Sequence, residues 1–235
     1  MLAIQDFTVS HQKGVQVIEN LSLTLLPGKI HGIVGLNGSG KTTFLKALYG
    51  SIPRVGGTIS WKGSSVSQKH IAFLETHNFF YHKITGYEYL RLFQMKNPAF
   101  DIAQWNRLFD LPLNKLVDNY STGMKKKLAF LGVLTLDRPV LILDEPYNGV
   151  DVESYSKIQI ILRKLAQQGK TILITSHIFE SLVAICDQIS LLKQKQIRQT
   201  FEKATFAQLE KEMFDLLNEQ TTEVVNELLM KNRNQ

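Results

Sequence analysis

In the first third of the chain, short apolar runs alternate with polar residues, a pattern typical of β-strands. Pro27-Gly28 interrupts two of these runs and predicts a turn between them. The runs cover Leu2 to Val9, Leu21 to Leu26, Ile30 to Val34, Gly57 to Trp61 and Ile71 to Leu74. We therefore expect several short strands in this region.

Two stretches have helical spacing instead. The first follows Gly40, where Phe44, Leu45 and Leu48 recur at helical intervals until Gly50. The second runs from about Thr85 to Leu136, in which apolar positions recur at helical intervals. This second stretch predicts an all-helical insert.

Strand signals return at Val140 to Leu143 and at Thr171 to Thr175. Between them, apolar residues at helical spacing predict an amphipathic helix that ends at Gly169. The strand-helix-strand order favours a parallel, doubly wound sheet with helices on both faces. After about Thr200 we expect only a short helical tail.

The composition is that of a soluble globular protein, with 235 residues, of which 44% are apolar and 20% are charged. At about 150 residues per domain, one large domain with an inserted subdomain fits this length. No window reaches about 18 apolar residues and no signal peptide is recognisable, so we expect a membrane role only through a partner. The single cysteine, Cys186, excludes a disulfide framework and favours a cytoplasmic protein.

The net charge of +6 comes from 27 Lys and Arg against 21 Asp and Glu. The basic residues are scattered, except for the run Lys125 to Lys127. Such scatter favours anionic partners without indicating a nucleic acid, and we expect no nucleic-acid partner. The run itself is expected to be a solvated helix face.

One segment, from Gly35 to Thr42, matches the pattern G-x-x-x-x-G-K-[ST] between a predicted strand and a predicted helix. Its backbone N–H groups would converge on phosphate oxygens, Lys41 would reach the β- and γ-phosphates, and Thr42 would bind Mg²⁺. The alternative is a glycine-rich turn that caps a helix. The predicted nucleotide-binding residues here are Gly35, Asn37, Gly38, Ser39, Gly40, Lys41, Thr42 and Thr43.

Two adjacent carboxylates, Asp144 and Glu145, end the apolar strand that begins at Val140. Strand ends in such sheets face the ligand crevice. Asp144 suits an indirect or water-mediated contact with Mg²⁺, and Glu145 suits activation of a water that attacks the γ-phosphate. Taken alone, the pair is equally compatible with a solvated strand end or a helix cap.

The segment Tyr120-Ser121-Thr122-Gly123-Met124, followed by three lysines, resembles the signature of ABC ATPases, in a form common among exporter ATPases. Ser121 has the character of a helix N-cap. The resemblance covers about residues 1 to 200. It implies an α/β fold: a P-loop NTPase core with a doubly wound, mostly parallel sheet, a small N-terminal antiparallel β subdomain, and a helical subdomain inserted at about 77–136. Residues 201–235 would form the tail.

The resemblance also assigns roles to residues outside the phosphate loop. Ser121 and Gly123 would contact the nucleotide of a second subunit, and Asp151 would cross the dimer interface. His177 would contact the γ-phosphate. The expected catalytic residues are then Lys41, Glu145 and His177.

Two positions depart from the family pattern. Thr76 stands where a glutamine is expected and Glu75 where proline is usual, so Thr76 would join Thr42 and Asp144 as the metal-binding set. An aromatic residue that stacks on adenine is expected near residue 12, where Gln12 is found. His11 or Val17 would then supply the contact with the base.

Together these features predict an ATP-binding and ATP-hydrolysing subunit that dimerises around MgATP, with itself or with another ABC ATPase subunit. It would drive integral membrane permease subunits, for export, from the inner face of the cell membrane. The segment Thr76 to Lys83 would face the permease. Because three consecutive aromatics, Phe79, Phe80 and Tyr81, cannot all point inward, at least one is expected near the surface.

Three alternatives remain. A soluble, non-transport ABC ATPase, for example in cofactor assembly, would share all of these motifs. A P-loop GTPase or small-molecule kinase fits less well, because the segment Asn114 to Asp118 misses N-K-x-D by one residue and neither class explains the signature. A regulatory module that does not hydrolyse ATP is disfavoured by the presence of Glu145 and His177.

Overall fold

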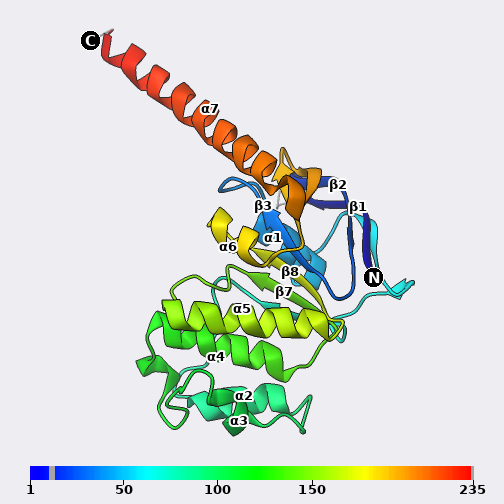
Figure 1. The fold of residues 1–235 in the computed structure, drawn as a ribbon, viewed down its shortest axis with the longest axis vertical. Helices are drawn as coiled ribbons and strands as arrows, with labels where there is room; N and C mark the ends of the chain where they lie inside the picture. Colours follow the sequence, from blue (N-terminus) through cyan, green and yellow to red (C-terminus); the bar gives the residue numbers. More distant parts are fainter. Residues whose placement is uncertain (11–13, 234–235) are drawn as a thin grey trace.

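The computed structural model describes residues 1–10 and 14–233, which form two β-sheets and a set of helices (Figure 1). The strands are β1 (Leu2–Ser10), β2 (Gln16–Leu25), β3 (Ile30–Val34), β4 (Gly56–Trp61), β5 (Ser64–Ser65), β6 (Ile71–Leu74), β7 (Val140–Asp144), β8 (Thr171–Thr175), β9 (Gln188–Lys193) and β10 (Gln196–Glu202). The helices are α1 (Lys41–Tyr49), α2 (Gly86–Gln94), α3 (Ile102–Asn106), α4 (Thr122–Thr135), α5 (Val152–Gln167), α6 (Phe179–Ile185) and α7 (Phe206–Arg233).

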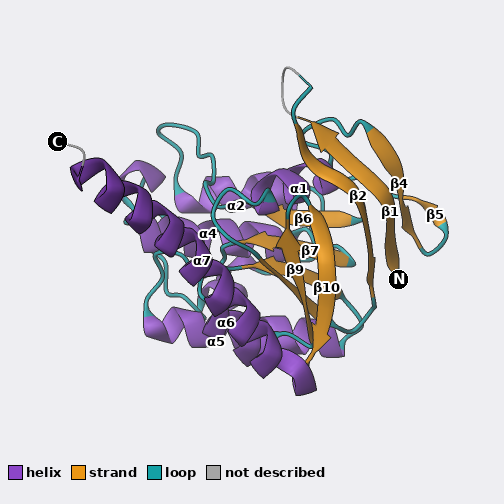
Figure 2. Ribbon diagram, turned by 90° about the horizontal axis from the view of Figure 1, so that it is seen from above, coloured by secondary structure: helices purple, strands orange, loops and turns teal. Residues whose placement is uncertain are grey.

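The first sheet is antiparallel and has the order β2-β1-β4-β5. The second has the order β10-β9-β3-β8-β7-β6, in which all neighbours are parallel except β10 and β9. Figure 2 shows the two sheets side by side. This arrangement confirms the predicted α/β fold with a mostly parallel sheet and an antiparallel N-terminal sheet.

Strand β7 shows why the second sheet lies at the centre of the molecule. Val140 and Ile142 pack with α1 and the first sheet, whereas Leu141 and Leu143 pack with the helices on the opposite face. Because successive side chains point to opposite faces, a strand buried on both must be apolar throughout. That is why β7 is a continuous apolar run up to Asp144.

The predicted helical insert contains α2, α3 and α4, and both α2 and α3 pack on α4. Helix α2 begins with a capping box, in which Thr85 and Glu88 each bind the backbone of the other. Figure 1 shows this group at one end of the molecule and α7 projecting at the other.

The C-terminal part differs from the sequence-based expectation. Strands β9 and β10 were not predicted, and the polar edge strand β10 gave no alternating signal because only Phe201 in it is buried. Helix α7 spans 28 residues and is the longest described helix. The predicted domain boundary at residue 200 falls within β10, and the division into domains stays a prediction.

Among the residues that the structure describes, no helix combines the length and apolar character that crossing a bilayer requires.

Candidate active site

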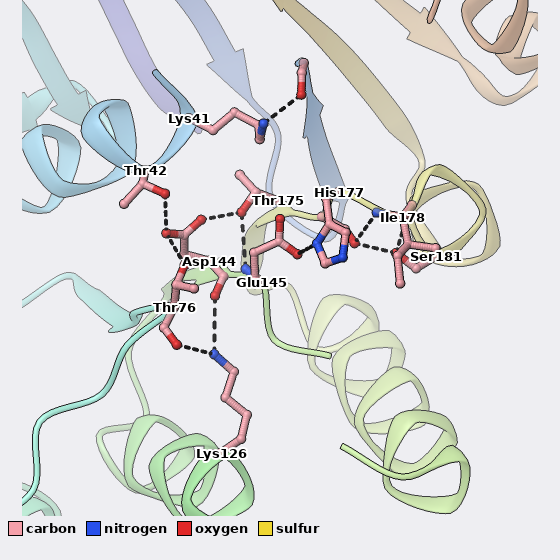
Figure 3. A network of polar contacts seen from close by, with 12 residues as sticks. Lys41, Thr42, Thr76, Lys126, Asp144, Glu145, Thr175, His177, Ile178 and Ser181 are labelled. Carbon is pink, nitrogen blue, oxygen red and sulfur yellow. Dashed lines mark hydrogen bonds and ion pairs between the residues drawn. The ribbon is translucent and has the colours of Figure 1, made fainter. Parts of the chain in front are cut away.

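The predicted site residues gather where four neighbouring strands end. Strands β3, β8, β7 and β6 are adjacent and parallel, so their carboxyl ends share one edge of the sheet. The phosphate loop follows β3, His177 follows β8, Glu145 follows β7 and Thr76 follows β6. Figure 3 shows the side chains that meet there. This edge is the usual ligand crevice of such sheets.

The phosphate loop wraps around a pocket of about 400 Å³. Gly38 and Gly40 adopt φ values of 77° and 101°, which favour glycine, and no side chain caps the start of α1. The N–H groups at this helix N-terminus are therefore available to an anion. The pocket is lined by Val17, Asn37, Gly38, Ser39, Gly40, Lys41, Thr42, Thr43, Thr76 and Glu145. Gly35 lies deeper, where a Cβ atom would come 2.5 Å from the carbonyl oxygen of Leu192.

The polar groups of this loop are suited to a phosphate. Lys41 Nζ donates to the carbonyl oxygens of Gly35 and Leu36, at 2.7 and 3.1 Å, and burial lowers the pKa of this lysine. The buried Ser39 Oγ has no hydrogen-bond partner in the described part of the chain. A cation and an unsatisfied hydroxyl beside free helix N–H groups fit an anionic ligand.

Three threonine hydroxyls converge on the carboxylate of Asp144. Thr42 and Thr76 donate to Oδ2, at 2.8 and 2.7 Å, and Thr175 donates to Oδ1 at 2.6 Å. The structure therefore brings together the three predicted metal-binding residues, Thr42, Thr76 and Asp144. Such a set of oxygen atoms is what Mg²⁺ prefers. Thr175 was not predicted, although a buried hydroxyl at the end of the strand beside Asp144 could have indicated it.

Glu145 and His177 form a pair at the mouth of the site, with Nδ1 of the histidine 2.8 Å from Oε2 of the glutamate. Glu145 has a φ of 51°, an unusual value for a residue with a side chain. Its backbone N–H points to Thr175, whose carbonyl and hydroxyl oxygens both lie at 3.3 Å. The backbone therefore turns sharply just after Asp144 and directs Glu145 towards His177.

Past His177, a second turn is fixed by Ser176, whose hydroxyl accepts hydrogen bonds from the N–H of Ile178 and the hydroxyl of Ser181. These serines were not predicted as part of the site. They hold the chain on the carboxyl side of His177.

The start of α4 matches the predicted helix cap: Ser121 is its N-cap and accepts a hydrogen bond from the N–H of Met124. The first turn also lies against the loop that precedes α5 in the same chain. A Cβ atom on Gly123 would lie 2.6 Å from the carbonyl oxygen of Gly149. Gly123 is thus required for a close approach within the chain.

Asp151, predicted to cross a dimer interface, caps α5 in its own chain. Its carboxylate accepts hydrogen bonds from the N–H and the hydroxyl of Ser154 and from Lys127, whose Nζ lies at 3.2 Å. These contacts, the Ser154 N–H first, lower the pKa of Asp151. More than half of the side chain remains exposed.

The predicted solvated face of Lys125 to Lys127 is wrong for Lys126, which is only 4% exposed. Its ammonium group donates to the carbonyl oxygens of Glu75 and Thr76, at 3.0 and 3.2 Å, and lies 3.5 Å from that of Asp144 (Figure 3). Burial lowers its pKa to about 8. The sequence could not indicate this burial, because the three consecutive lysines are identical in it. Only the orientation of the helix turns the middle one towards the sheet.

The base-binding candidates have different outcomes. Val17 lines the phosphate pocket and lies against Gly40, on which a Cβ atom would come 2.9 Å from Val17 Cγ1. His11 and Gln12 lie outside the described residues.

The aromatic segment confirms that at least one ring lies near the surface. Phe79 is 75% exposed and Tyr81 is 58% exposed, and their rings meet edge to face. Phe80 turns inward and packs on Tyr89 of α2. A groove of about 430 Å³ beside them is lined by residues including Thr76, His77, Phe79, Phe80, Thr122 and Asn148.

A larger hollow of about 590 Å³ lies between α3, α4 and α5. It contains none of the predicted nucleotide-binding or catalytic residues. The chemistry of the phosphate loop, and not the size of the cavity, therefore identifies the candidate site.

Residues 18–148 match the family model described as "ABC transporter". The chain is 32% identical over 193 residues to the ABC transporter ATP-binding protein YtrB of Bacillus subtilis, a match that covers 78% of this chain and 66% of YtrB, just under two thirds of that protein.

Two further similarities cover more of the known protein. The chain is 28% identical to the putative ABC transporter ATP-binding protein AlbC of Bacillus subtilis, over 92% of this chain and 98% of AlbC. The fold is similar to that of the ATP-binding cassette MJ0796, solved as a dimer with ADP and phosphate, with a TM-score of 0.75 and 19% identity over 86% of this chain and 99% of that one.

Proposed function

This chain belongs to the ABC transporter family and carries its ATPase cassette, and we propose that it powers a membrane transporter by hydrolysing ATP between two paired cassettes. The second cassette is another copy of this chain or a second ABC ATPase subunit. The observation that carries the proposal is the convergence of Lys41, Asp144 and Glu145 at one edge of the sheet.

The phosphate loop binds the triphosphate in this proposal. Lys41 exchanges the carbonyl oxygens of Gly35 and Leu36 for the β- and γ-phosphate oxygens. Ser39, Thr43 and the backbone from Gly38 to Lys41 supply further donors, and the dipole of α1 favours the negative charge. Val17, and His11 nearby in the sequence, are proposed to contact the base.

Thr42, Thr76 and Asp144 are the residues that would hold Mg²⁺, because both threonine hydroxyls already lie within hydrogen-bond distance of Asp144 Oδ2. When bound, the ion neutralises charge on the phosphates. Thr175 keeps the Asp144 carboxylate in place through Oδ1 and leaves Oδ2 for the two other threonines.

Glu145 is the proposed general base. A carboxylate at this position accepts a proton from the attacking water as the water oxygen bonds to the γ-phosphorus and the bond from that phosphorus to its bridging oxygen breaks, which gives ADP and inorganic phosphate. In the structure Glu145 is held by His177, so we propose that His177 orients the carboxylate and contacts the γ-phosphate through its other ring nitrogen. Lys41 stabilises the charge that develops on the phosphate.

The opposite cassette completes the site. The N-terminus of α4 is a suitable anion-binding element, because Ser121 satisfies only one of its free N–H groups. We propose that Ser121 and Gly123 contact the γ-phosphate held by the partner cassette. Asp151 has an exposed portion beyond its own helix cap and would approach the partner.

Integral membrane permease subunits are the proposed partners, and they would hold the chain at the inner face of the membrane. The exposed rings of Phe79 and Tyr81, with the groove beside them, suit a short amphipathic helix. Export as the direction rests on the form of the segment from Tyr120 to Met124, which resembles exporter ATPases.

Two measurements on the protein purified from membranes test this function. We expect Mg²⁺-dependent ATP hydrolysis and co-purification with an integral membrane protein. Hydrolysis without any membrane partner would favour the non-transport ABC ATPase. Absence of ATP binding and hydrolysis would contradict the proposed function altogether.

A further inference from the structure

Lys126 is a buried cation on the first turns of α4 that belongs to neither the phosphate loop nor the metal-binding set. Its ammonium group lies under the carboxyl ends of β6 and β7, against the carbonyl oxygens of Glu75, Thr76 and Asp144. Burying an ammonium group is unfavourable unless its donors are satisfied. Here three carbonyl oxygens lie within 3.5 Å of the ammonium nitrogen, as many acceptors as it has N–H groups.

These contacts close a cycle of hydrogen bonds around the metal-binding residues. The Lys126 ammonium group donates to the Thr76 carbonyl oxygen, and the Thr76 hydroxyl donates to Asp144 Oδ2. The cycle closes because the same ammonium group also donates to the Asp144 carbonyl oxygen. Lys126 thus approaches the backbone at the ends of β6 and β7 from the side of α4. The Asp144 carboxylate lies on the other side, towards Thr42 of the phosphate loop (Figure 3).

At the end of β6, few other ties hold this spacing. The pairing of β6 with β7 stops after Leu74 and Leu143, whereas Asp144 is also fixed on the side of β8 by Thr175. The Glu75 side chain points away to Lys46 of α1, at 3.3 Å. Thr76 is short, so its hydroxyl reaches Asp144 only if its backbone is brought close.

We infer that Lys126 is a positioning residue that holds Thr76 and Asp144 at the spacing required to bind the metal ion of MgATP. Because it belongs to α4, it also fastens the start of this helix to the hydrolytic site of its own chain. The inference rests on the proposed function and adds a residue to it.

The test compares Lys126→Met, Lys126→Arg and the matched control Lys125→Met in the full chain. Methionine keeps the apolar stem and removes the donors, whereas arginine keeps charge and donors. Lys125 is the adjacent lysine and is only half-buried, and its side chain takes part in none of the hydrogen bonds found among the described residues. Fluorescent ATP is titrated with Mg²⁺ and again with EDTA, and hydrolysis and thermal unfolding are recorded.

In Lys126→Met we expect ATP affinity in EDTA to stay within about threefold of the wild type, while the gain in affinity on adding Mg²⁺ falls at least about fivefold. The hydrolysis rate should fall at least about tenfold. Lys126→Arg should recover part of both, and Lys125→Met should change neither. If Lys126→Met does not fold, Lys126→Gln, with its amide donor on a shorter stem, takes its place in the same comparison.

A loss of ATP affinity that is equal with Mg²⁺ and with EDTA, or an unchanged response to Mg²⁺, would overturn the inference, because a lysine that only supports the fold has no preference for the metal complex. These outcomes are separate from failure of the proposed function. In that case the wild-type chain itself would neither bind nor hydrolyse ATP.

Discussion

Two sites hold a lysine in similar ways but arise from the chain differently. One is the phosphate loop, which holds Lys41, and the other is the junction of α4 with the ends of β6 and β7, which holds Lys126. The loop is one continuous segment, and Lys41 binds carbonyl oxygens only five and six residues away. At the junction, Lys126 binds carbonyl oxygens 50, 51 and 18 residues away. The first site is therefore built by local backbone geometry, and the second exists only once the sheet has formed.

The surroundings of the two lysines separate their roles. Lys41 lines an open pocket, so a phosphate can take the place of its carbonyl partners. Lys126 is enclosed, and its partners are backbone atoms of the strands themselves. Burial lowers the pKa of both groups, yet only Lys41 is placed to meet a ligand.

Glu145→Gln should reduce steady-state hydrolysis by at least about a hundredfold and leave ATP binding intact. The amide still accepts a hydrogen bond from His177 or from water, but it does not take up the proton of the water. Phosphate release and ATP titration measure the two effects. Hydrolysis at nearly the wild-type rate would remove Glu145 from the role of base.

Lys41→Ala should weaken both ATP affinity and turnover, each by about tenfold or more, because a cation is removed from the phosphates. The loss of affinity should persist in EDTA, in contrast to Lys126→Met. ATP titrations with and without Mg²⁺ make the comparison. Unchanged ATP affinity and unchanged turnover would contradict the assignment of the phosphate loop.

Gly123→Ala should lower hydrolysis by about tenfold while the single chain binds ATP normally, since the new Cβ forces the carbonyl of Gly149 away. Ser121→Ala removes both the helix cap and the proposed contact with the partner's γ-phosphate, so it should lower the free energy of unfolding by about 1 kcal/mol and lower hydrolysis as well. Chemical denaturation measures the first effect and ATPase assays measure the second. Full activity and stability in Gly123→Ala would show that this close approach is dispensable.

Phe79→Ala should leave unfolding and basal hydrolysis within about twofold of the wild type and weaken assembly with the permease, because this ring is exposed. Phe80→Ala is the contrasting variant: its ring packs on Tyr89, so we expect a loss of about 1–3 kcal/mol in the free energy of unfolding. Co-purification of the membrane subunit gives the assembly readout. Normal assembly of Phe79→Ala would place the docking surface elsewhere.

Features encoded within a short window could be predicted from the sequence. The strand from Ile30 to Val34, the helix that begins at Lys41 and the cap at Ser121 all follow from local spacing and residue type. Asp144 and Glu145 could be found because a buried parallel strand is apolar until it reaches the crevice.

Features that depend on distant packing could not be predicted. Lys126 is one of three consecutive lysines, and only the docking of α4 on β6 and β7 decides that it is the buried one. The hydrogen bond from Thr175 to Asp144 depends on the pairing of β7 with β8. The polar edge strand β10 is held by β9, and its own sequence carries little strand signal.

The central claim, that two cassettes close on MgATP, is tested most directly by the molar mass of Glu145→Gln in solution. Light scattering after gel filtration would compare saturating MgATP with ATP in EDTA, for the chain alone and with any second ATPase subunit that co-purifies. We predict that MgATP converts the 26.7 kDa chain into a dimer and that EDTA leaves it single. If the mass in MgATP stayed that of a single chain, both for the chain alone and in the presence of the second subunit, the result would contradict the closure of two cassettes on MgATP.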